Sequence, residues 1–400
     1  MSGGSTPRTM HVMLSRAARG TRPLVPLSTA IWIVVGVAGW AGLIVIGAQL
    51  AAMVPPRAGD DLRLLVEAAG RWRDGAPLYA GAASSGSLVA EGLFYSYPPL
   101  VAQVLVPLTS LPFVIVLAGW SVGAATGLAI AARQLGRMGR RVTLPAVALS
   151  AFVYPYAVAT LFGNVNAWFP FLFGLVLIAV LLPSRRSAFA GGVALAVASA
   201  AKLHPAILGV WLLARRWRNG PADSGGRILA MAIAIGLGLL AASLIIGGVG
   251  PWADYVAFLR GGAAQADIVS RLNIGPASQI AQAFGLSEAA ARTIQVPITL
   301  TALAATIAAG RLLEDPVASF GAATIASLVI LPVTWFHYPV ALIPVAIAAA
   351  ARAEPAARRT TLAALVAALV AAGLAIVAPV AVWIAAGFVL LAIYLSRPRA

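Results

Sequence analysis

Residues 29–54 read TAIWIVVGVAGWAGLIVIGAQLAAMV, an apolar run without a charged residue. Its length fits the roughly 17–25 residues that a helix needs to cross the hydrocarbon core of a bilayer. The run is too long for the apolar core of a signal peptide, and no convincing small-residue cleavage site accompanies it. We therefore expect a retained first membrane helix after a cytoplasmic N-terminal segment, residues 1–28, which carries arginines and no acid.

Similar runs recur along the chain, in which 61% of the 400 residues are hydrophobic and only 10% are charged. A soluble protein of this size would need a more polar surface, so the composition indicates a membrane protein. No gap between the runs is long enough for a separate soluble domain. The expected fold is an all-α polytopic membrane protein of about 11–12 transmembrane helices, forming one integral domain over residues 29–400.

The net charge of +16 comes from arginines in short loops between the apolar runs. Cationic loops remain in the cytoplasm, so this distribution reflects topology and does not indicate nucleic-acid binding. The chain has no cysteine, which excludes disulfides and thiolate-bound metals.

The same arginines predict the orientation. Inward ends of the runs carry arginine, whereas outward ends carry Asp, Asn, Lys or His. Both termini are then cytoplasmic in a multi-pass protein of the cell membrane, and the stretches 55–110 and 250–292 are external loops. The short runs near 187–201 and 205–214 share a proline; if they form one broken helix, everything downstream inverts and the arginine pattern fits badly.

Adjacent carboxylates, Asp60 and Asp61, precede an amphipathic stretch just after the first membrane helix. Asp is favoured at helix N-caps. Alternatively, one carboxylate is a general base whose neighbour raises its pKa by like-charge repulsion. Both interpretations hold if Asp60 caps the helix and Asp61 faces a cleft.

Polar side chains also interrupt two other apolar runs, at the ends that are expected to face outward. Asn164 and Asn166 in GNVN either cap the next helix or bind sugar hydroxyls or phosphate. Lys202 is the sole lysine and, with His204, breaks an apolar run beside Pro205. These ionisable residues either snorkel to the interface or, because charge at membrane depth is costly, mark a bound anion.

The final candidates lie later in the chain. His337 sits between Trp335 and Tyr338, either within an interfacial aromatic belt or as a donor to phosphate. Arg260, Arg271 and Arg292 fall in the second external loop, where topology does not require arginine and a guanidinium could bind a phosphate or an acidic headgroup. No second His or acid has metal-ligand spacing relative to His337, so we expect no metal site.

Nucleotide-binding motifs are also missing. We find no Walker loop, no Rossmann glycine pattern and no nucleotide-sugar domain. A membrane enzyme working on the outer face would then need a lipid-linked donor.

Four motifs in order resemble glycosyltransferase family 87. The segment DLRLLVEAAGRWRDGAPLY (61–79) followed by YSYPPL (95–100) resembles the start of the family, through Asp61, Gly75, Tyr79, Pro98 and Pro99. GNVN resembles its Gly-Gln-x-Asn step, AKLHP its Lys-x-x-Pro helix start, and TWFHY its Ser-Trp-x-His element. Leu65 stands where the family often has Tyr, and Asn273 loosely matches a later Asn-x-Ser stretch.

The resemblance implies a GT-C type bundle whose active site lies between external loops and helix ends. It implies an inverting transfer of mannose or arabinofuranose from a polyprenyl-phosphate sugar to a glycolipid or glycan of the cell envelope, without a cofactor. Asp61 and His337 are the expected catalytic residues. Groups expected to bind the donor phosphate or sugar are Lys202, Asn164, Asn166, Arg260, Arg271 and Asn273. Secondary candidates are Asp60, His204, Tyr97 and Trp335.

The residues also leave two other functions open. A lipid or solute transporter or flippase would carry polar residues on both sides of the membrane and broken helices in matched halves. The polar set here is one-sided, and we see no internal repeat. A membrane scaffold without enzymatic activity would not need Lys202 within an apolar run.

Overall fold

The computed structural model describes residues 27–79, 95–139, 142–220, 223–260 and 268–397. Within these ranges the regular structure is helical, and the one extended pairing is an isolated antiparallel bridge between Asn273 and Trp335. The expected all-α fold is therefore confirmed. The N-terminal segment 1–26 and part of the first expected external loop, 80–94, lie outside the described residues.

The helices of the first half are α2 (Leu27–Ala52), α3 (Asp60–Arg73), α4 (Pro99–Leu105), α5 (Phe113–Leu135), α6 (Thr143–Ser150), α7 (Tyr154–Leu161), α8 (Phe169–Leu181) and α9 (Arg185–Ala201). Those of the second half are α10 (Ile207–Asn219), α11 (Ser224–Gly247), α12 (Gly250–Arg260), α13 (Pro276–Phe284), α14 (Glu288–Leu312), α15 (Pro316–Val329), α16 (Ile343–Arg352), α17 (Arg358–Leu374) and α18 (Ala381–Leu395). Short 3-10 helices connect several of them: η3 (Val106–Ser110), η4 (Gly136–Met138), η5 (Val165–Trp168), η6 (His204–Ala206) and η8 (Tyr338–Leu342).

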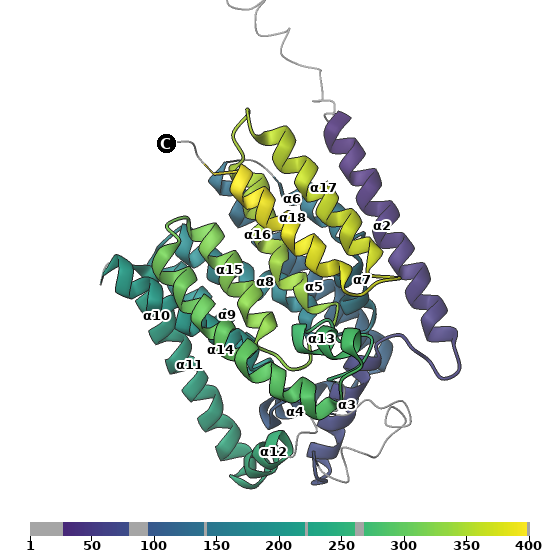
Figure 1. Cartoon of the computed structure of the whole chain (residues 1–400). Helices are drawn as coiled ribbons and strands as arrows, with labels where there is room; N and C mark the ends of the chain where they lie inside the picture. The colour runs from purple at the N-terminus through teal and green to yellow at the C-terminus, as the bar shows by residue number, and fades with distance from the viewer. Residues whose placement is uncertain (1–26, 80–94, 140–141, 221–222, 261–267, 398–400) are drawn as a thin grey trace, which may run out of the picture.

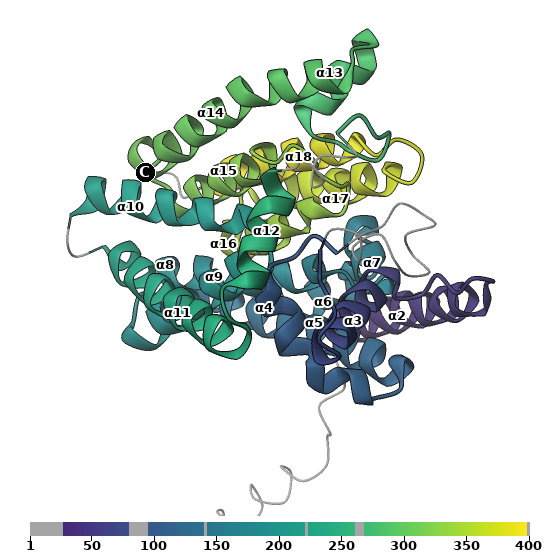
Figure 2. The same ribbon diagram turned by 90° about the horizontal axis from the view of Figure 1, so that it is seen from below.

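Figure 1 shows a bundle with α2 along one side and α11 along the other, and with α3, α4 and α12 at its lower end. The view from below in Figure 2 places α2, α11 and α14 at the margins. These marginal helices expose large apolar side chains, such as Val34, Leu237 and Leu300. Such faces suit contact with lipid chains, in which apolar exposure carries no cost.

The membrane-spanning elements are less regular than the sequence predicts. Within the described ranges, four helices are long and apolar enough to cross a bilayer alone, or five if the bent pair α6 and α7, which turns by 68°, counts as one span. Other apolar runs form shorter helices, including α15 and α18. The runs near 187–201 and 205–214 are two helices, α9 and α10, divided by η6.

Proline shapes the broken ends. Pro205 lies in the first turn of η6 and Pro339 in the first turn of η8, where its missing N–H costs no intrahelical hydrogen bond. The backbone of Lys202, just after α9, is extended and interrupts the helix before η6. Helices therefore restart at these points, and the short connections leave polar side chains at the helix ends.

The start of α3 docks on the end of α7. Gly59 N donates to Leu161 O at 2.9 Å, and Asp61 N donates to Phe162 O at 3.1 Å. Gly163 permits this approach, since it has a φ of +65° and a Cβ there would lie 2.5 Å from Leu62 Cβ. Only glycine meets both requirements without strain, and the contact fixes Asp61 beside the turn before η5.

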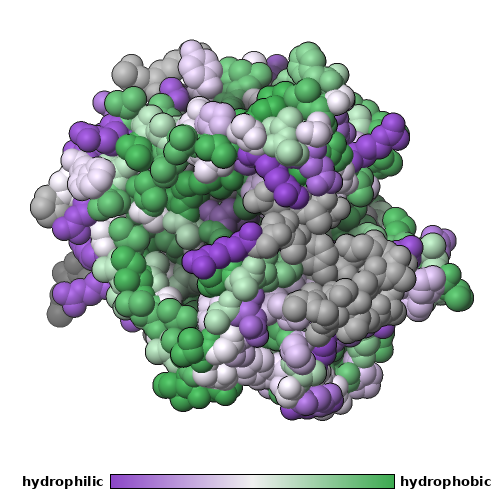
Figure 3. Space-filling model, turned by 60° about the horizontal axis from the view of Figure 1, so that its bottom comes forward, coloured by the Kyte–Doolittle hydropathy of each residue, from purple (hydrophilic) through white to green (hydrophobic). Residues whose placement is uncertain are grey.

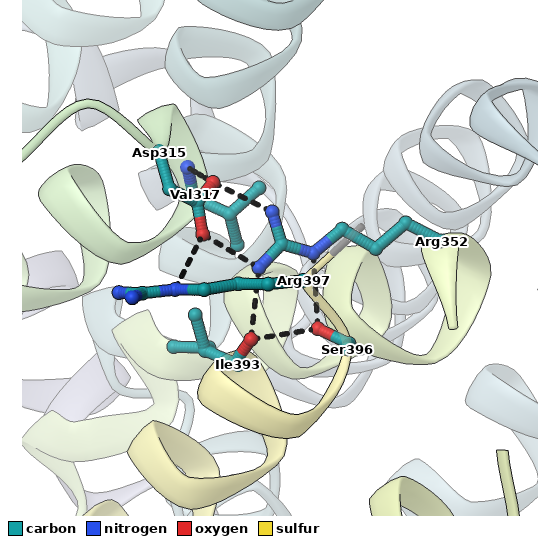
Figure 4. Close-up of polar contacts among 6 residues, drawn as sticks. All are labelled: Asp315, Val317, Arg352, Ile393, Ser396 and Arg397. Atoms are coloured by element: carbon teal, nitrogen blue, oxygen red, sulfur yellow. Dashed lines mark hydrogen bonds and ion pairs between the residues drawn. The ribbon is translucent and has the colours of Figure 1, made fainter. Parts of the chain in front are cut away.

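A second polar cluster secures the other end of the bundle, near the end of α18 (Figure 4). Arg352 donates through two nitrogens to the Asp315 carboxylate, at 2.6 and 2.7 Å, and also to Ser396 Oγ and Ile393 O, each at 3.0 Å. Asp315 in turn accepts from the backbone N–H of Val317. The cluster ties together the start of α15 and the ends of α16 and α18.

Candidate active site

Asp61 is held by an amide from a distant part of the chain. Asn164 Nδ2 donates to Asp61 Oδ2 at 2.8 Å. The other end of this amide accepts from Asn166 N at 2.9 Å and so caps η5. Asn164 therefore caps η5, which was one of its two alternatives, and it also orients a carboxylate, while its binding of sugar hydroxyls or phosphate stays a prediction.

Asp60 has a different environment. It is the first residue of α3, after the N-cap Gly59, so the expectation that its side chain caps the helix is wrong. Its carboxylate is 3% exposed and lies 3.6 Å from Arg57 Nη1. A carboxylate in the first helical turn is still favourable to the helix dipole. The two neighbouring acids therefore have different partners, and Asp61 is the one hydrogen-bonded to the residue that caps η5.

Lys202 lies in the turn between α9 and η6, under two tyrosine rings. Its Nζ is 3.8 Å from the centroid of the Tyr338 ring and 5.8 Å from that of Tyr97. Aromatic faces attract an ammonium group through their negative quadrupole. Lys202 as a whole residue is half-buried, and its ammonium group is held by these two rings.

The YSYPP motif positions Tyr97. Tyr79 Oη donates to Tyr97 O, while Tyr95 Oη donates to Pro98 O at 2.7 Å and accepts from Ala102 N at 3.1 Å. These bonds fix the turn into α4. The conformation of this turn brings the Tyr97 ring towards Lys202.

Both histidines of the region lie close to the same lysine. His204 stacks on Tyr338 with ring centroids 5.9 Å apart, and His337 meets Tyr338 edge-on at 5.2 Å. Burial lowers the pKa of His337 well below its ordinary value, and the charge of Lys202 adds to this effect. His337 is therefore a neutral hydrogen-bonding group.

Asp61 and Lys202 influence each other electrostatically. Burial raises the pKa of Asp61, against the lowering effects of the Asn164 hydrogen bond and the Lys202 charge. Burial also lowers the pKa of Lys202 to about 7, although the charge of Asp61 opposes this shift. An acid with a raised pKa facing a lysine with a lowered one is typical of functional sites.

The lower face of the bundle comes forward in Figure 3. The view shows it hollowed near the centre, with hydrophobic side chains along much of the rim and hydrophilic ones in and beside the hollow.

The sequence pattern of glycosyltransferase family 87 matches residues 95–334, more than half of the chain. The chain belongs to this family. The matched range contains Asn164 and Lys202, whereas Asp61 and His337 lie outside it. Family membership makes this protein a membrane glycosyltransferase.

Two relatives of this family 87 enzyme come from Mycolicibacterium smegmatis. One is a polyprenol-phosphate-mannose-dependent alpha-(1-2)-phosphatidylinositol pentamannoside mannosyltransferase, 25% identical over 258 residues, which are 62% of this chain and 59% of the relative. The other is a polyprenol-phosphate-mannose-dependent alpha-(1-2)-phosphatidylinositol mannoside mannosyltransferase, 27% identical over 357 residues, which are 80% of this chain and 76% of the relative.

In this family 87 chain, Asn273 is a structural residue. Its amide nitrogen donates to Ile268 O and Pro332 O, each at 3.0 Å, and its amide oxygen accepts from Gly275 N and Thr334 N, each at 2.9 Å. The side chain is fully buried, and protein groups use both ends of the amide. The expectation that it binds sugar or phosphate is therefore wrong, since no hydrogen-bonding capacity remains for a ligand.

The three candidate arginines of residues 250–292 make no contact with Lys202 that the described ranges record. Arg260 ends α12 and Arg271 precedes Asn273, both exposed and without a hydrogen bond or ion pair within the described ranges. Arg292 faces Glu288 at 3.5 Å on the surface of α14. In this structure they do not join the cluster around Lys202, although 261–267, between Arg260 and Arg271, lies outside the description.

Trp335 contributes to the site through backbone contacts. It forms the isolated bridge with Asn273, and its carbonyl accepts from Tyr338 N at 2.9 Å. These contacts fix the turn that carries His337 and Tyr338. Tyr338 itself is the residue that sequence reasoning underestimated, because its position beside Trp335 suggested only an interfacial aromatic. Among the described residues, no group of three or more His, Cys, Asp or Glu could hold a metal.

Proposed function

We propose that this protein transfers a mannosyl unit from polyprenyl-phosphate-mannose to a phosphatidylinositol-type glycolipid, with inversion at the anomeric carbon. The observation that carries the proposal is the pairing of Asp61, fixed by Asn164, with Lys202, the two acting on each other across one site. The names of the two mycobacterial relatives support the mannosyl donor and the acceptor class.

On the acceptor side, Asp61 acts as the general base. Asn164 occupies Oδ2, and Oδ1 has no hydrogen-bond partner among the described residues. Oδ1 takes the proton from the acceptor hydroxyl as the hydroxyl oxygen attacks the anomeric carbon. The raised pKa of Asp61, caused by burial, makes the carboxylate a stronger base than an exposed one.

On the donor side, the bond from the anomeric carbon to the phosphate oxygen breaks as the new glycosidic bond forms. Negative charge develops on the departing polyprenyl phosphate, where Lys202 and His337 stabilise it. His337 Nε2 is buried and has no partner within the described ranges, which leaves it available as a donor. Because phosphate leaves readily as an anion, the reaction needs one carboxylate and not the pair found in glycosidases.

We further place this chemistry on the outer face of the cell membrane, with both termini in the cytoplasm. The support is the arginine bias of the opposite loops. A polyprenyl-linked donor suits this location, because its sugar is carried by the membrane itself.

The direct test is transfer by the purified protein in lipid nanodiscs. Radiolabelled polyprenyl-phosphate-mannose and mixed envelope glycolipids should give a labelled glycolipid of inverted anomeric configuration, and the Asp61→Asn protein should give almost none. Transfer from polyprenyl-phosphate-arabinose but not from the mannosyl donor would reject the assigned sugar. Movement of the labelled donor across vesicle membranes without any transfer would favour the flippase alternative.

A further inference from the structure

Two buried polar side chains next to the site have no protein partners. Asn166 is 0% exposed and His204 is 4% exposed. Neither the Asn166 amide atoms Oδ1 and Nδ2 nor the two ring nitrogens of His204 make a hydrogen bond within the described residues. Leaving such groups unpaired is unfavourable, because each loses its hydrogen bonds to water without a replacement. Two fully unpaired side chains in one region therefore point to an additional ligand.

The two side chains belong to one part of the fold. Phe169 follows Asn166 by three positions along the continuous η5–α8 helix and so lies on the same helical face. Its ring is 5.5 Å from that of His204, centroid to centroid. Tyr338 also stacks on His204, with its ring plane 14° from that of the imidazole. Since η5 packs against η8, Asn166 and His204 belong to segments that meet around Tyr338.

The location is on the donor side of the site. Lys202 lies against the Tyr338 ring at 3.8 Å, and its charge acts on His204. Asp61, by contrast, is held by Asn164 at the start of α3. A group bound by Asn166 and His204 would therefore lie next to the phosphate that Lys202 meets.

The chemistry of the unpaired atoms selects the ligand. A carboxamide offers donors and an acceptor, and a neutral imidazole offers one of each. A phosphate ester has only acceptor oxygens when ionised and would leave Asn166 Oδ1 and one His204 nitrogen unpaired. A hydroxyl group both donates and accepts, so adjacent sugar hydroxyls can satisfy both side chains.

We propose that Asn166 and His204 form a subsite for the ring hydroxyls of the sugar that is transferred. The proposal rests on the proposed function, in which the neighbouring Lys202 binds the donor phosphate. It assigns His204 a role in recognising the sugar, and it makes both residues determinants of sugar specificity.

Binding measurements test the subsite separately from catalysis. The purified protein in nanodiscs is titrated with polyprenyl-phosphate-mannose, with sugar-free polyprenyl phosphate and with a series of monodeoxy-mannosyl donors. The wild type should bind the mannosyl donor about 10- to 100-fold more tightly than at least one monodeoxy donor. Removal of the hydroxyl that the subsite holds leaves Asn166 or His204 unpaired again.

The variants His204→Phe and Asn166→Leu complete a cycle with the deoxy donors. Phenylalanine suits the aromatic surroundings of His204, and leucine is close to asparagine in shape. Each variant should bind the mannosyl donor as weakly as the wild type binds the deoxy donor that lacks the recognised hydroxyl. The variants and the wild type should bind that deoxy donor with equal affinity. Affinity for sugar-free polyprenyl phosphate should stay unchanged, which also reports correct folding.

A matched control is Thr361→Val on α17, which removes another fully buried hydroxyl without a partner among the described residues. It should leave the discrimination between donors intact. The subsite is rejected if both variants discriminate among the deoxy donors as the wild type does, or if the wild type binds mannosyl and sugar-free lipids equally. If the proposed function is wrong, the transfer assay shows no transfer. The sugar-dependent affinity does not require turnover, so it tests the subsite separately from the proposed function.

Discussion

Asn164 Nδ2 donates a hydrogen bond of 2.8 Å to Asp61 Oδ2, joining residues that lie 103 positions apart in the chain. The bond links α3 to the capped start of η5. It also selects Asp61 over its neighbour Asp60, which faces Arg57. The orientation and the protonation of the proposed base are therefore both coupled to η5.

Replacement of Asn164 by leucine should shift the acid limb of the pH–rate profile. The amide hydrogen bond lowers the pKa of Asp61 against the effect of burial. Without it the pKa rises, so the active carboxylate form appears only at higher pH. We expect kcat/KM, relative to that of the wild type at the same pH, to fall at neutral pH and to recover partly as the pH is raised. An acid limb at the wild-type pH would contradict this coupling.

The substitution Asp61→Asn should reduce transfer by about 10²- to 10⁴-fold, the usual effect of removing a general base. Asn164→Leu keeps the carboxylate and should be much less severe at high pH. Asp60→Asn is the matched neighbouring change and should also have a much smaller effect on transfer per folded molecule. Initial rates with radiolabelled donor measure both, and a larger loss for Asp60→Asn would move the base by one position.

Lys202 should determine the alkaline limb of the profile. Its pKa is lowered to about 7 by burial, so the free enzyme loses the ammonium charge as the pH rises through that value. Donor binding, and with it kcat/KM, should then fall. Lys202→Met should bind donor weakly at every pH, whereas Lys202→Arg should keep its charge and lose the alkaline limb. Wild-type kinetics for Lys202→Met would leave the lysine without a role in phosphate binding.

The cluster of Asp315 and Arg352 should contribute to stability and not to transfer. Both side chains are largely buried, and removal of one partner of such a pair costs about 3–5 kcal/mol of unfolding free energy. Arg352→Met should therefore lower Tm clearly. Arg397→Met is the control, because this arginine is 42% exposed and lies 3.5 Å from the same carboxylate. Equal Tm values for the two variants would show that burial is not decisive here.

The orientation can be tested with single cysteines, since the chain contains none. Ser110→Cys and Ser287→Cys, both at exposed positions, should react with an impermeant thiol reagent in intact cells. Ala356→Cys, exposed before α17, should react only after lysis. The reverse labelling pattern would invert the proposed topology and place the site in the cytoplasm.

The fold class and the position of each apolar run could be predicted from the sequence, because an apolar run is recognised from consecutive residues along a short stretch of chain. Residues 29–54 and α2 show this agreement. The amphipathic helix after Asp60 could be predicted for the same reason. The family could also be identified, since its motifs are local groups such as GNVN and AKLHP.

Tertiary packing decided which polar residues share a site. Asn273 and Asn164 look alike in sequence, yet backbone groups saturate the first amide and the second holds Asp61. Tyr338 resembled an interfacial aromatic, yet its ring lies over Lys202. Hydrogen bonds and ring contacts depend on distances of a few ångströms between segments far apart in the chain. Local pattern does not contain those distances, and only the packing of α3, η5, η6 and η8 sets them.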